Sequence, residues 1–476
     1  MLYQEKLYME EVMSNKTERG NFSGKIGFIM AAAGSAVGLG NIWRFPYLAA
    51  KDNGGIFLLC YIILAVTFGF TLLTTEVAIG RKTAQGPLTA YGVIHKKWKG
   101  IGVLACLVPI IILPYYCVIG GWVIKYFLSF ATGASKAAAG DSYFTGYITS
   151  QWEPIIWMVV FLLATAFVIY CGVNKGIEKY SKILMPVLLL LVLGISIYSL
   201  TLRFTDDSGV TRTGLQGLKI YLIPDFTGMT LKKLMIVIMD AMGQLFFSIS
   251  VAMGIMVAYG SYVKKDVNLM QSINYIEIFD TVVAVLAGMM IVPAVYIFMG
   301  TDGMGKGPGL MFVSLPKVFD AMGAVGAVIG VLFFVMVLFA AITSSVSVME
   351  AIVSSFMDGF GWSRKKCVAV ITAYALVGGI VVCLGYNLWY FEITLPNGNI
   401  AQILDIMDYI SNNLLMPAVA ILNCILIGWV AKPITIIEEV ENGTYKFRRK
   451  YLYIAMVKVV APILMFILLL QSIGVF

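Results

Sequence analysis

The stretch GSAVGLGNIWRFP, residues 34–46, interrupts an otherwise apolar segment that is long enough to cross a membrane. Glycines and other small residues fill its first half, and Asn41 and Arg44 precede Pro46 in its second half. Glycine weakens a helix, and polar side chains are costly in lipid. Irregular backbone at membrane depth is tolerated where it lines a cavity or is buried in protein. We therefore predict a membrane-spanning helix that is broken at this stretch.

The composition of the whole chain indicates a polytopic membrane protein. Of its 476 residues, 60% are hydrophobic and only 13% are charged, which lies outside the range of soluble domains. A helix needs about 20 apolar residues to cross the hydrocarbon core. Eleven runs meet this requirement, at 25–49, 56–80, 101–131, 154–173, 182–202, 234–260, 272–300, 321–357, 367–389, 402–430 and 451–476. We predict an all-α integral membrane protein with eleven transmembrane helices.

Basic residues at the ends of the runs predict the orientation. They fall in alternate loops, and such loops lie in the cytoplasm; these residues are Arg81, Lys82, Lys96, Lys97, Lys99, Lys175, Lys179, Lys264, Lys265, Arg364, Lys365, Lys366, Arg448, Arg449 and Lys450. The N-terminus is expected on the same side and the C-terminus outside, in a plasma (inner) membrane. The net charge of +8 is spread over these loops, so no nucleic-acid partner is predicted.

Few side chains suit catalysis. The only histidine, His95, lies in a predicted loop beside lysines, and the seven cysteines form no CxxC pair. The sequence also lacks a GxxxxGK[ST] phosphate-binding loop. We predict that the protein is not an enzyme and that its energy comes from something other than nucleotide hydrolysis by this chain.

A second interruption, GQLFFSISVAMG at residues 243–254, lies five predicted spans after the first. Paired breaks in corresponding spans are typical of inverted-repeat transporters with a binding site at the membrane midplane. The half-helix N-termini suit a carboxylate, and freed carbonyls suit cations, so an α-amino acid with Na⁺ would fit. The alternative is that these small residues only allow close helix packing.

The two breaks divide the chain into predicted parts. These are a cytoplasmic N-terminal segment (1–24), a first repeat of helices 1–5 (25–202), an extracellular loop (203–233), a second repeat of helices 6–10 (234–430), a cytoplasmic loop (431–450) and helix 11 (451–476).

Polar residues in other spans are suited to the same chemistry. In AAITSSVSVME, residues 340–350, Ala340, Thr343 and Ser344 share one helix face and offer oxygen ligands for an alkali cation. These hydroxyls could instead bond to carbonyls of their own helix. Asp280 and Glu76 are expensive in lipid unless they are paired or functional. For Glu76, a packing role and a working role are equally open.

The motif GSAVGLGNIWRFPY, followed by NGGIF, resembles the neurotransmitter:sodium symporter family, and in particular its bacterial eleven-helix amino-acid transporters. The resemblance implies two Na⁺ sites. One would use the Ala36 carbonyl, Asn41, Ser248, Asp280 and the substrate carboxylate. The other would use the Gly34, Val37 and Ala340 carbonyls with Thr343 and Ser344.

The resemblance also implies a substrate site and two gates. The substrate's polar groups would meet Ala36, Leu39, Gly40, Tyr116, Phe247, Ser248 and Ser250. Its side chain would lie among Ile112, Tyr116, Phe247, Met253, Ser344 and Val348. Arg44 with Asp408 would form the outer gate, and Arg19 with Asp358 the inner gate. Phe22 stands where the family usually has tryptophan, and Asp280 where many members have asparagine.

Gly38 bears on the substrate class. Monoamine transporters of this family carry an aspartate at that position, so glycine implies a substrate that brings its own carboxylate. We expect sodium-coupled import of a hydrophobic or aromatic amino acid, by alternating access and without chloride, by a monomer or weak dimer in the lipid bilayer. The alternatives are a non-transporting amino-acid sensor on the same fold and an ion channel.

The run KGIEKYSKILMP, residues 175–186, adds one expectation about movement. Gly176 and Pro186 bracket the cytoplasmic start of helix 5, which should be the easiest part of that helix to unwind. The alternative is ordinary helix-start chemistry.

Overall fold

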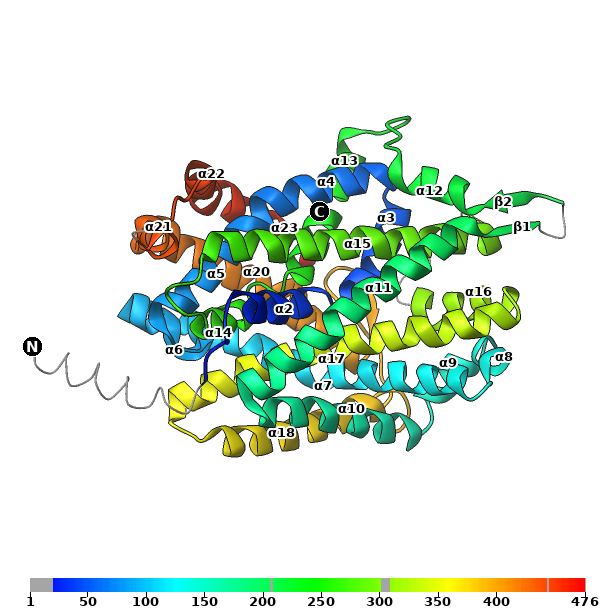
Figure 1. Cartoon of the computed structure of the whole chain (residues 1–476), viewed down its shortest axis with the longest axis horizontal. Helices are drawn as coiled ribbons and strands as arrows, with labels where there is room; N and C mark the ends of the chain where they lie inside the picture. The colour runs from blue at the N-terminus through cyan, green and yellow to red at the C-terminus, as the bar shows by residue number, and fades with distance from the viewer. Residues whose placement is uncertain (1–19, 206–208, 301–308, 443–444, 476) are drawn as a thin grey trace, which may run out of the picture.

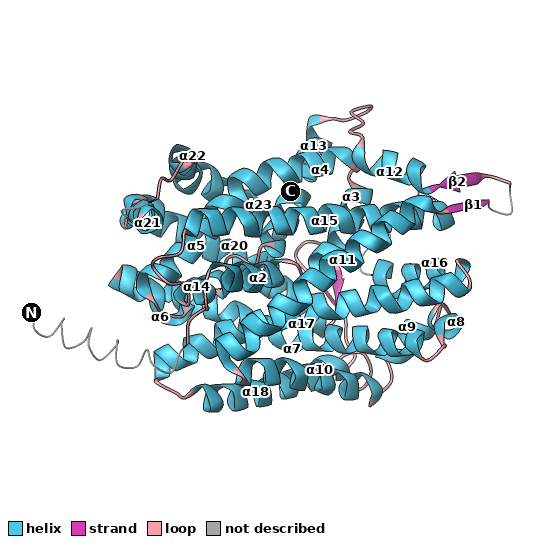
Figure 2. Ribbon diagram, in the orientation of Figure 1, coloured by secondary structure: helices cyan, strands magenta, loops and turns pink. Residues whose placement is uncertain are grey.

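The structure is a computed structural model that describes residues 20–205, 209–300, 309–442 and 445–475. Most of its long helices run side by side along the long axis of the molecule (Figure 1). Figure 2 shows that helices make up nearly the whole fold, with the β1–β2 hairpin at one edge. The all-helical membrane fold predicted from the apolar runs is confirmed.

The first half contains the first broken helix and four further spans. Its elements are α2 (Lys25–Ala36), η2 (Gly40–Arg44), α3 (Phe45–Lys51), α4 (Gly55–Leu64), η3 (Ala65–Gly69), α5 (Phe70–Thr83), α6 (Pro87–Ile94), η4 (Lys96–Trp98), α7 (Gly100–Ala131), α8 (Ser135–Ala138), α9 (Tyr143–Ile148), α10 (Glu153–Tyr170), η5 (Val173–Glu178) and α11 (Lys179–Thr201).

A short region joins the halves. It holds the antiparallel strands β1 (Arg203–Thr205) and β2 (Thr211–Thr213), in which Arg203 faces Thr213, and the helix α12 (Gly214–Leu222). The Thr213 side chain accepts from the Gln216 amide, and the Gln216 side chain accepts from the Thr213 amide. This reciprocal capping starts α12 directly after the strand.

The second half contains the second broken helix and the remaining spans. Its elements are α13 (Leu231–Ser248), α14 (Ile255–Ser261), α15 (Leu269–Met299), η7 (Leu310–Ser314), α16 (Leu315–Ala321), α17 (Ala324–Phe360), α18 (Arg364–Leu384), β3 (Ile393–Thr394), β4 (Ile400–Ala401), α19 (Ile403–Asp408), η8 (Tyr409–Leu415), α20 (Met416–Ile425), η9 (Leu426–Val430), α21 (Ile434–Glu441), α22 (Lys450–Ala455), η10 (Met456–Val460) and α23 (Ala461–Ser472).

The count of spans differs in one respect from the predicted eleven. Within the described ranges, nine helices are long and apolar enough to cross a membrane, and the bent pair formed by α2 and residues 40–51 makes a tenth. The predicted sixth run, 234–260, is divided between α13 and α14 and is not among them. Its break is wider than the first, and α13 also carries charged residues such as Lys232, Lys233 and Asp240.

Several spans contain a wide π-helical turn that is continuous with the α-helix on at least one side. These turns are η2, η3, η5, η8, η9 and η10, and η7 is a further one outside the spans. A π turn carries one extra residue relative to an α-helix and often occurs at functional sites. The η2 turn follows the first break directly and begins at Gly40.

The start of helix 5 is wound in this structure. The π turn η5 leads directly into α11, and Pro186 lies inside that helix. A side chain at Gly176 would collide with the Val168 carbonyl of α10, so glycine is needed here for close packing. Close packing, besides backbone freedom, therefore explains why a glycine occupies position 176. The expected unwinding of this segment stays a prediction.

The two broken helices lie at the centre of the fold. The helix α2 packs against α11, α15 and α17, and α14 packs against α5 and α17. A long pair formed by α7 and α17 covers one side. The breaks are thereby surrounded by protein, which is the condition for irregular backbone at membrane depth.

Candidate functional site

The first break lies between α2 and η2, where the chain bends by 52°. The amide of Val37 still bonds to the Ala33 carbonyl at 2.7 Å, and the Gly38 amide bonds to the Ala36 carbonyl at 3.0 Å. A Cβ atom at Gly38 would lie 2.6 Å from the Ser344 Oγ. Glycine therefore gives room where the backbone of the break approaches α17, and a side chain here would displace the Ser344 hydroxyl.

The second break, residues 249–254, joins α13 to α14. Ser250 and Ala252 both adopt positive φ angles, 55° and 59°, which side-chain-bearing residues rarely adopt. The Ala252 amide donates to the Glu76 Oε1 at 2.7 Å, and the Ser250 hydroxyl donates to the Ser35 carbonyl at 3.0 Å. These contacts tie the second break to α5 and to α2, and they give Glu76 a bonded role at the break.

A buried carboxylate joins the regions around both breaks. The Asp280 Oδ1 accepts from the Asn41 Nδ2 at 2.8 Å and from the Ser248 Oγ at 2.7 Å. Its Oδ2 accepts from the Tyr61 hydroxyl at 3.0 Å, and the Asp280 side chain is fully buried. Four elements, η2, α4, α13 and α15, thus meet at one group of oxygen atoms.

A second group of oxygen atoms lies between α2 and α17. Gly34 lets the helices approach so closely that a Cβ there would be 3.3 Å from the Thr343 Cβ. The Thr343 hydroxyl donates to the Ala340 carbonyl at 3.1 Å and the Ser344 hydroxyl to the Ser35 carbonyl at 3.3 Å. The Thr343 hydroxyl therefore bonds within its own helix, the alternative left open by the sequence, while its lone pairs stay available.

A small cavity of about 30 Å³ lies between the two breaks. It is lined by all eleven residues predicted for the substrate: Ala36, Leu39, Gly40, Ile112, Tyr116, Phe247, Ser248, Ser250, Met253, Ser344 and Val348. Ser35, Gly38, Asn41 and Ile255 complete the lining. A cavity of this size holds about one or two water molecules, so its walls must shift before a larger molecule enters.

A polar vestibule of about 380 Å³ lies on the other side of Phe247. Arg44, Asp240 and Asn412 contribute to its lining, and Phe247 lines both spaces. The Arg44 guanidinium lies 5.8 Å from the centre of the Phe247 ring. Phe247 is therefore part of the wall between the vestibule and the inner cavity.

The residues predicted for the outer gate lie near one another. Asp408 accepts hydrogen bonds from the Tyr115 hydroxyl at 3.1 Å and the Asn412 Nδ2 at 2.6 Å. Arg44 lines the same vestibule as Asn412, the residue that bonds to Asp408. The structure thus links Asp408, through Asn412, to the vestibule that Arg44 and Phe247 line.

The predicted inner gate is described in part, because Arg19 lies outside the described residues. Asp358 accepts from the Gly86 amide. Phe22 packs edge-on against Tyr259 and Tyr262, with ring centres 5.8 and 6.1 Å apart. Phe22 therefore forms an aromatic cluster with these two tyrosines, which follow the second break in the sequence.

Several contacting residues were missed by the sequence reasoning. Tyr61 binds Asp280, and the Gln244 Nε2 donates to the Gly40 carbonyl at 3.0 Å. Near the inner gate, Glu350 accepts from the Tyr262 hydroxyl at 2.5 Å and from both Arg364 terminal nitrogens at 2.8 and 2.6 Å. A lone Gln beside a break and a Glu within an apolar span were the available signals.

The chain is similar to known proteins over nearly its whole length. The sequence profile of the sodium:neurotransmitter symporter family matches residues 19–153 and 146–476. The chain is 33% identical, over 463 residues, to an uncharacterized sodium-dependent transporter, YhdH, of Bacillus subtilis (strain 168); the match covers 95% of this chain and 98% of that protein. It is 25% identical over 479 residues to a human sodium- and chloride-dependent taurine transporter, covering 88% of this chain and 73% of the relative.

One solved structure is similar to this chain both in its fold and in its sequence. The crystal structure of MhsT in complex with L-phenylalanine superimposes with a TM-score of 0.82 at 33% identity, covering 95% of this chain and all of that one. The relatives of this chain are sodium-dependent transporters, not enzymes. By the family profile and by this relationship over nearly its whole length, the chain belongs to the sodium:neurotransmitter symporter family.

Proposed function

We propose that the protein is a sodium-coupled symporter that imports a hydrophobic or aromatic α-amino acid by alternating access. The observation that carries the proposal is the meeting of both helix breaks around one buried cavity, with the Asp280 carboxylate beside it. Backbone amides, carbonyls and hydroxyls surround this cavity. They suit a ligand with an amino group, a carboxylate and an apolar side chain.

The polar end of the substrate would bind the unwound backbone. The Leu39 and Gly40 amides begin the η2 segment and suit a carboxylate, which the Tyr116 hydroxyl would also contact. The amino group would meet the Ala36 carbonyl, the Phe247 and Ser248 carbonyls and the Ser250 hydroxyl. Gly38 leaves room for the substrate carboxylate beside Ser344.

The side chain of the substrate would occupy the apolar part of the cavity, among Ile112, Tyr116, Phe247, Met253, Ser344 and Val348. Met253 and Phe247 have rotatable side chains that can enlarge the space. The phenylalanine bound to the similar MhsT supports an aromatic or large aliphatic side chain here.

Two Na⁺ ions would couple transport to the sodium gradient. The first would be bound by the Ala36 carbonyl, Asn41, Ser248 and Asp280 together with the substrate carboxylate. The second would be bound by the Gly34, Val37 and Ala340 carbonyls, Thr343 and Ser344. Hydroxyl, carbonyl and carboxylate oxygens form a hard donor set that fits an alkali cation. In the described ranges, no cluster of three or more His, Cys, Asp or Glu side chains competes for another metal.

Transport would not require chloride. Asp280 supplies a fixed negative charge within the group formed by Asn41 and Ser248. A carboxylate at this position can balance the cations in the way that a bound anion would. Alternating access would use Arg44 with Asp408 on the outside and Arg19 with Asp358 on the inside, with the N-terminus cytoplasmic and the C-terminus extracellular.

The test is uptake of radiolabelled amino acids by purified protein in vesicles. We expect accumulation that depends on an inward Na⁺ gradient and is equal in sodium chloride and sodium gluconate. A more than fivefold loss in gluconate would contradict chloride independence. Binding without uptake would favour the amino-acid sensor, and Na⁺ current without saturable accumulation would favour the channel.

A further inference from the structure

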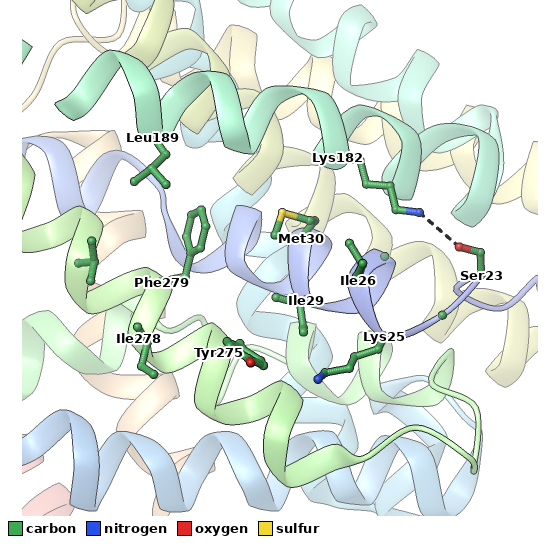
Figure 3. Close-up of a pocket in the computed structure, with 13 residues that line it drawn as sticks. Ser23, Lys25, Ile26, Ile29, Met30, Lys182, Leu189, Tyr275, Ile278 and Phe279 are labelled. Carbon is green, nitrogen blue, oxygen red and sulfur yellow. Dashed lines mark hydrogen bonds between the residues drawn. The ribbon is translucent and has the colours of Figure 1, made fainter. Parts of the chain in front are cut away.

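A groove of about 830 Å³ opens on the side of the protein between α2, α11 and α15 (Figure 3). Its walls are mostly apolar and include Ile26, Ile29, Met30, Leu189, Ile278 and Phe279. It shares no lining residue with the cavity between the two breaks. The groove is therefore a separate feature from the proposed substrate site.

The groove is open to the surroundings of the protein. Ile26 is 65% exposed and Ile278 is 57% exposed, although both are large apolar residues. All three wall helices belong to candidate membrane spans. Exposed apolar side chains on such helices contact lipid tails, so hydrocarbon chains are the molecules that reach this groove.

One end of the groove is polar and positively charged. Figure 3 shows Lys182 pointing to Ser23 and Lys25 pointing toward Tyr275, both away from Leu189. The Lys182 Nζ lies 3.3 Å from the Ser23 Oγ, and the Lys25 Nζ lies 4.8 Å from the Tyr275 ring centre.

The acidic side chain of Glu178 is paired with one of these two lysines. Glu178 accepts hydrogen bonds from Lys182 and from the Ser23 amide. Lys182 is thus paired with a carboxylate while Lys25 lies over the Tyr275 ring, so two ammonium groups and one carboxylate leave a net charge of about +1 at this end. Among the described residues that line the groove, no acidic side chain occurs.

We propose that this groove binds an anionic phospholipid of the cytoplasmic leaflet. The phosphate would lie beside Lys25 and Lys182, and an acyl chain would fill the apolar part. Basic pockets between membrane helices are suited to anionic headgroups. From Tyr275 to Val282 the α15 wall spans about 10 Å, enough for the upper part of an acyl chain.

The lipid would act on the inner half of the first broken helix, a consequence that rests on the proposed transport function. The helix α2 forms one wall of the groove and begins at Lys25 itself. A bound lipid would therefore bridge α2 to α11 and α15 and favour the conformation in which they are packed together. Its release would accompany any movement of α2 away from these helices.

The test measures lipid retention directly, so its outcome does not depend on transport. Delipidated protein is titrated with phosphatidylglycerol or phosphatidylcholine, and bound lipids are counted by native mass spectrometry. We expect phosphatidylglycerol to be retained more strongly, and the Lys25→Gln/Lys182→Gln variant to bind it about tenfold more weakly. The control is Lys365→Gln/Lys450→Gln, which removes two lysines that also lie over tyrosine rings, at 5.8 and 5.5 Å.

A second variant, Met30→Trp, tests the apolar part by filling the groove. It should weaken retention of the same lipid while leaving both lysines in place. Equal retention of the two lipids by the unmodified protein would overturn the proposal. So would unchanged retention by the Lys25/Lys182 variant, or an equal loss in the Lys365/Lys450 control.

Discussion

The first break spans three residues, 37–39, and is filled by Gly38 and its neighbours, whereas the second spans six, 249–254, and places Ser250 and Ala252 at positive φ. Backbone bonds to Ala33 and Ala36 remain in the first break. The second break depends on a bond from Ala252 to Glu76, which lies far away in the sequence.

The two breaks therefore show two ways in which an unwound segment of a membrane helix is stabilised. In the first, glycine gives room for a close approach to α17, and the remaining backbone bonds run to Ala33 and Ala36 nearby in the sequence. In the second, strained backbone is held by a side chain from another helix, so the fold must form first. Substitutions should therefore act differently at the two breaks.

The largest effect is expected for Gly38→Asp. Its Cβ would lie 2.6 Å from the Ser344 Oγ, and its carboxylate would face that of the substrate. Like charges in a low-dielectric site repel by several kcal/mol, which corresponds to about a 1,000-fold loss of amino-acid binding. Scintillation-proximity binding would measure it.

Gly38→Ala serves as the control, because it adds the steric clash without the charge. We expect a smaller loss for Ala, and for Asp a smaller loss with the decarboxylated amine than with the amino acid. Equal losses for the amine and the amino acid would show that the site is only blocked, and the assignment of Gly38 would fail.

The next effect is expected at Asp280, where the regions of the two breaks meet through Asn41 and Ser248. Asp280→Asn removes the fixed negative charge while keeping an oxygen acceptor. We expect uptake in chloride-free medium to fall about 100-fold, as two cations would lose their counter-charge. Added chloride should restore part of it. Unchanged uptake without chloride would mean that Asp280 only packs.

A smaller effect is expected at Glu76. Glu76→Ala leaves the buried Ala252 amide without its acceptor, at a cost of about 1–3 kcal/mol, which corresponds to about a 5- to 150-fold loss of affinity. Glu76→Gln keeps a carbonyl oxygen and should lose less than about threefold. The measurement is the equilibrium affinity of both variants for the amino acid. Equal affinities would contradict the proposal that the second break depends on this bond.

The smallest effect is expected for Ala252→Gly. Glycine relieves the positive φ at this position, and its greater chain entropy offsets most of the gain, so thermal stability should change by less than about 1 kcal/mol. The control is Ala241→Gly within α13, where the same change should cost at least about 1 kcal/mol. Similar melting shifts for the two variants would contradict a strained second break.

The same difference explains what the sequence could predict. The glycine-rich first break, the apolar runs and the polar face of Thr343 and Ser344 depend on neighbouring residues and were readable as patterns. The cavity lining that was expected from the family motif lies together in the structure. The functional roles given to these residues stay proposals.

Contacts between residues far apart in the sequence could not be predicted from the sequence alone. Nothing near Tyr61 indicates that its hydroxyl bonds to Asp280, 219 residues away. The role of Glu76 was left open because its partner is a backbone amide, which has no sequence signature. The sixth span was predicted as one run because hydropathy averages over a break that the backbone does not bridge.

The π-helical turns have a consequence for comparing relatives. Each holds one residue more than an α-helical turn, so deleting that residue would rotate the following segment by about 100° or restore a regular helix. In η9 and η10, which contact each other between α20 and α23, such a change would alter which side chains face the lipid. Single-residue gaps inside aligned membrane spans can therefore record a real change in helical winding during evolution, where they would otherwise be dismissed as alignment errors.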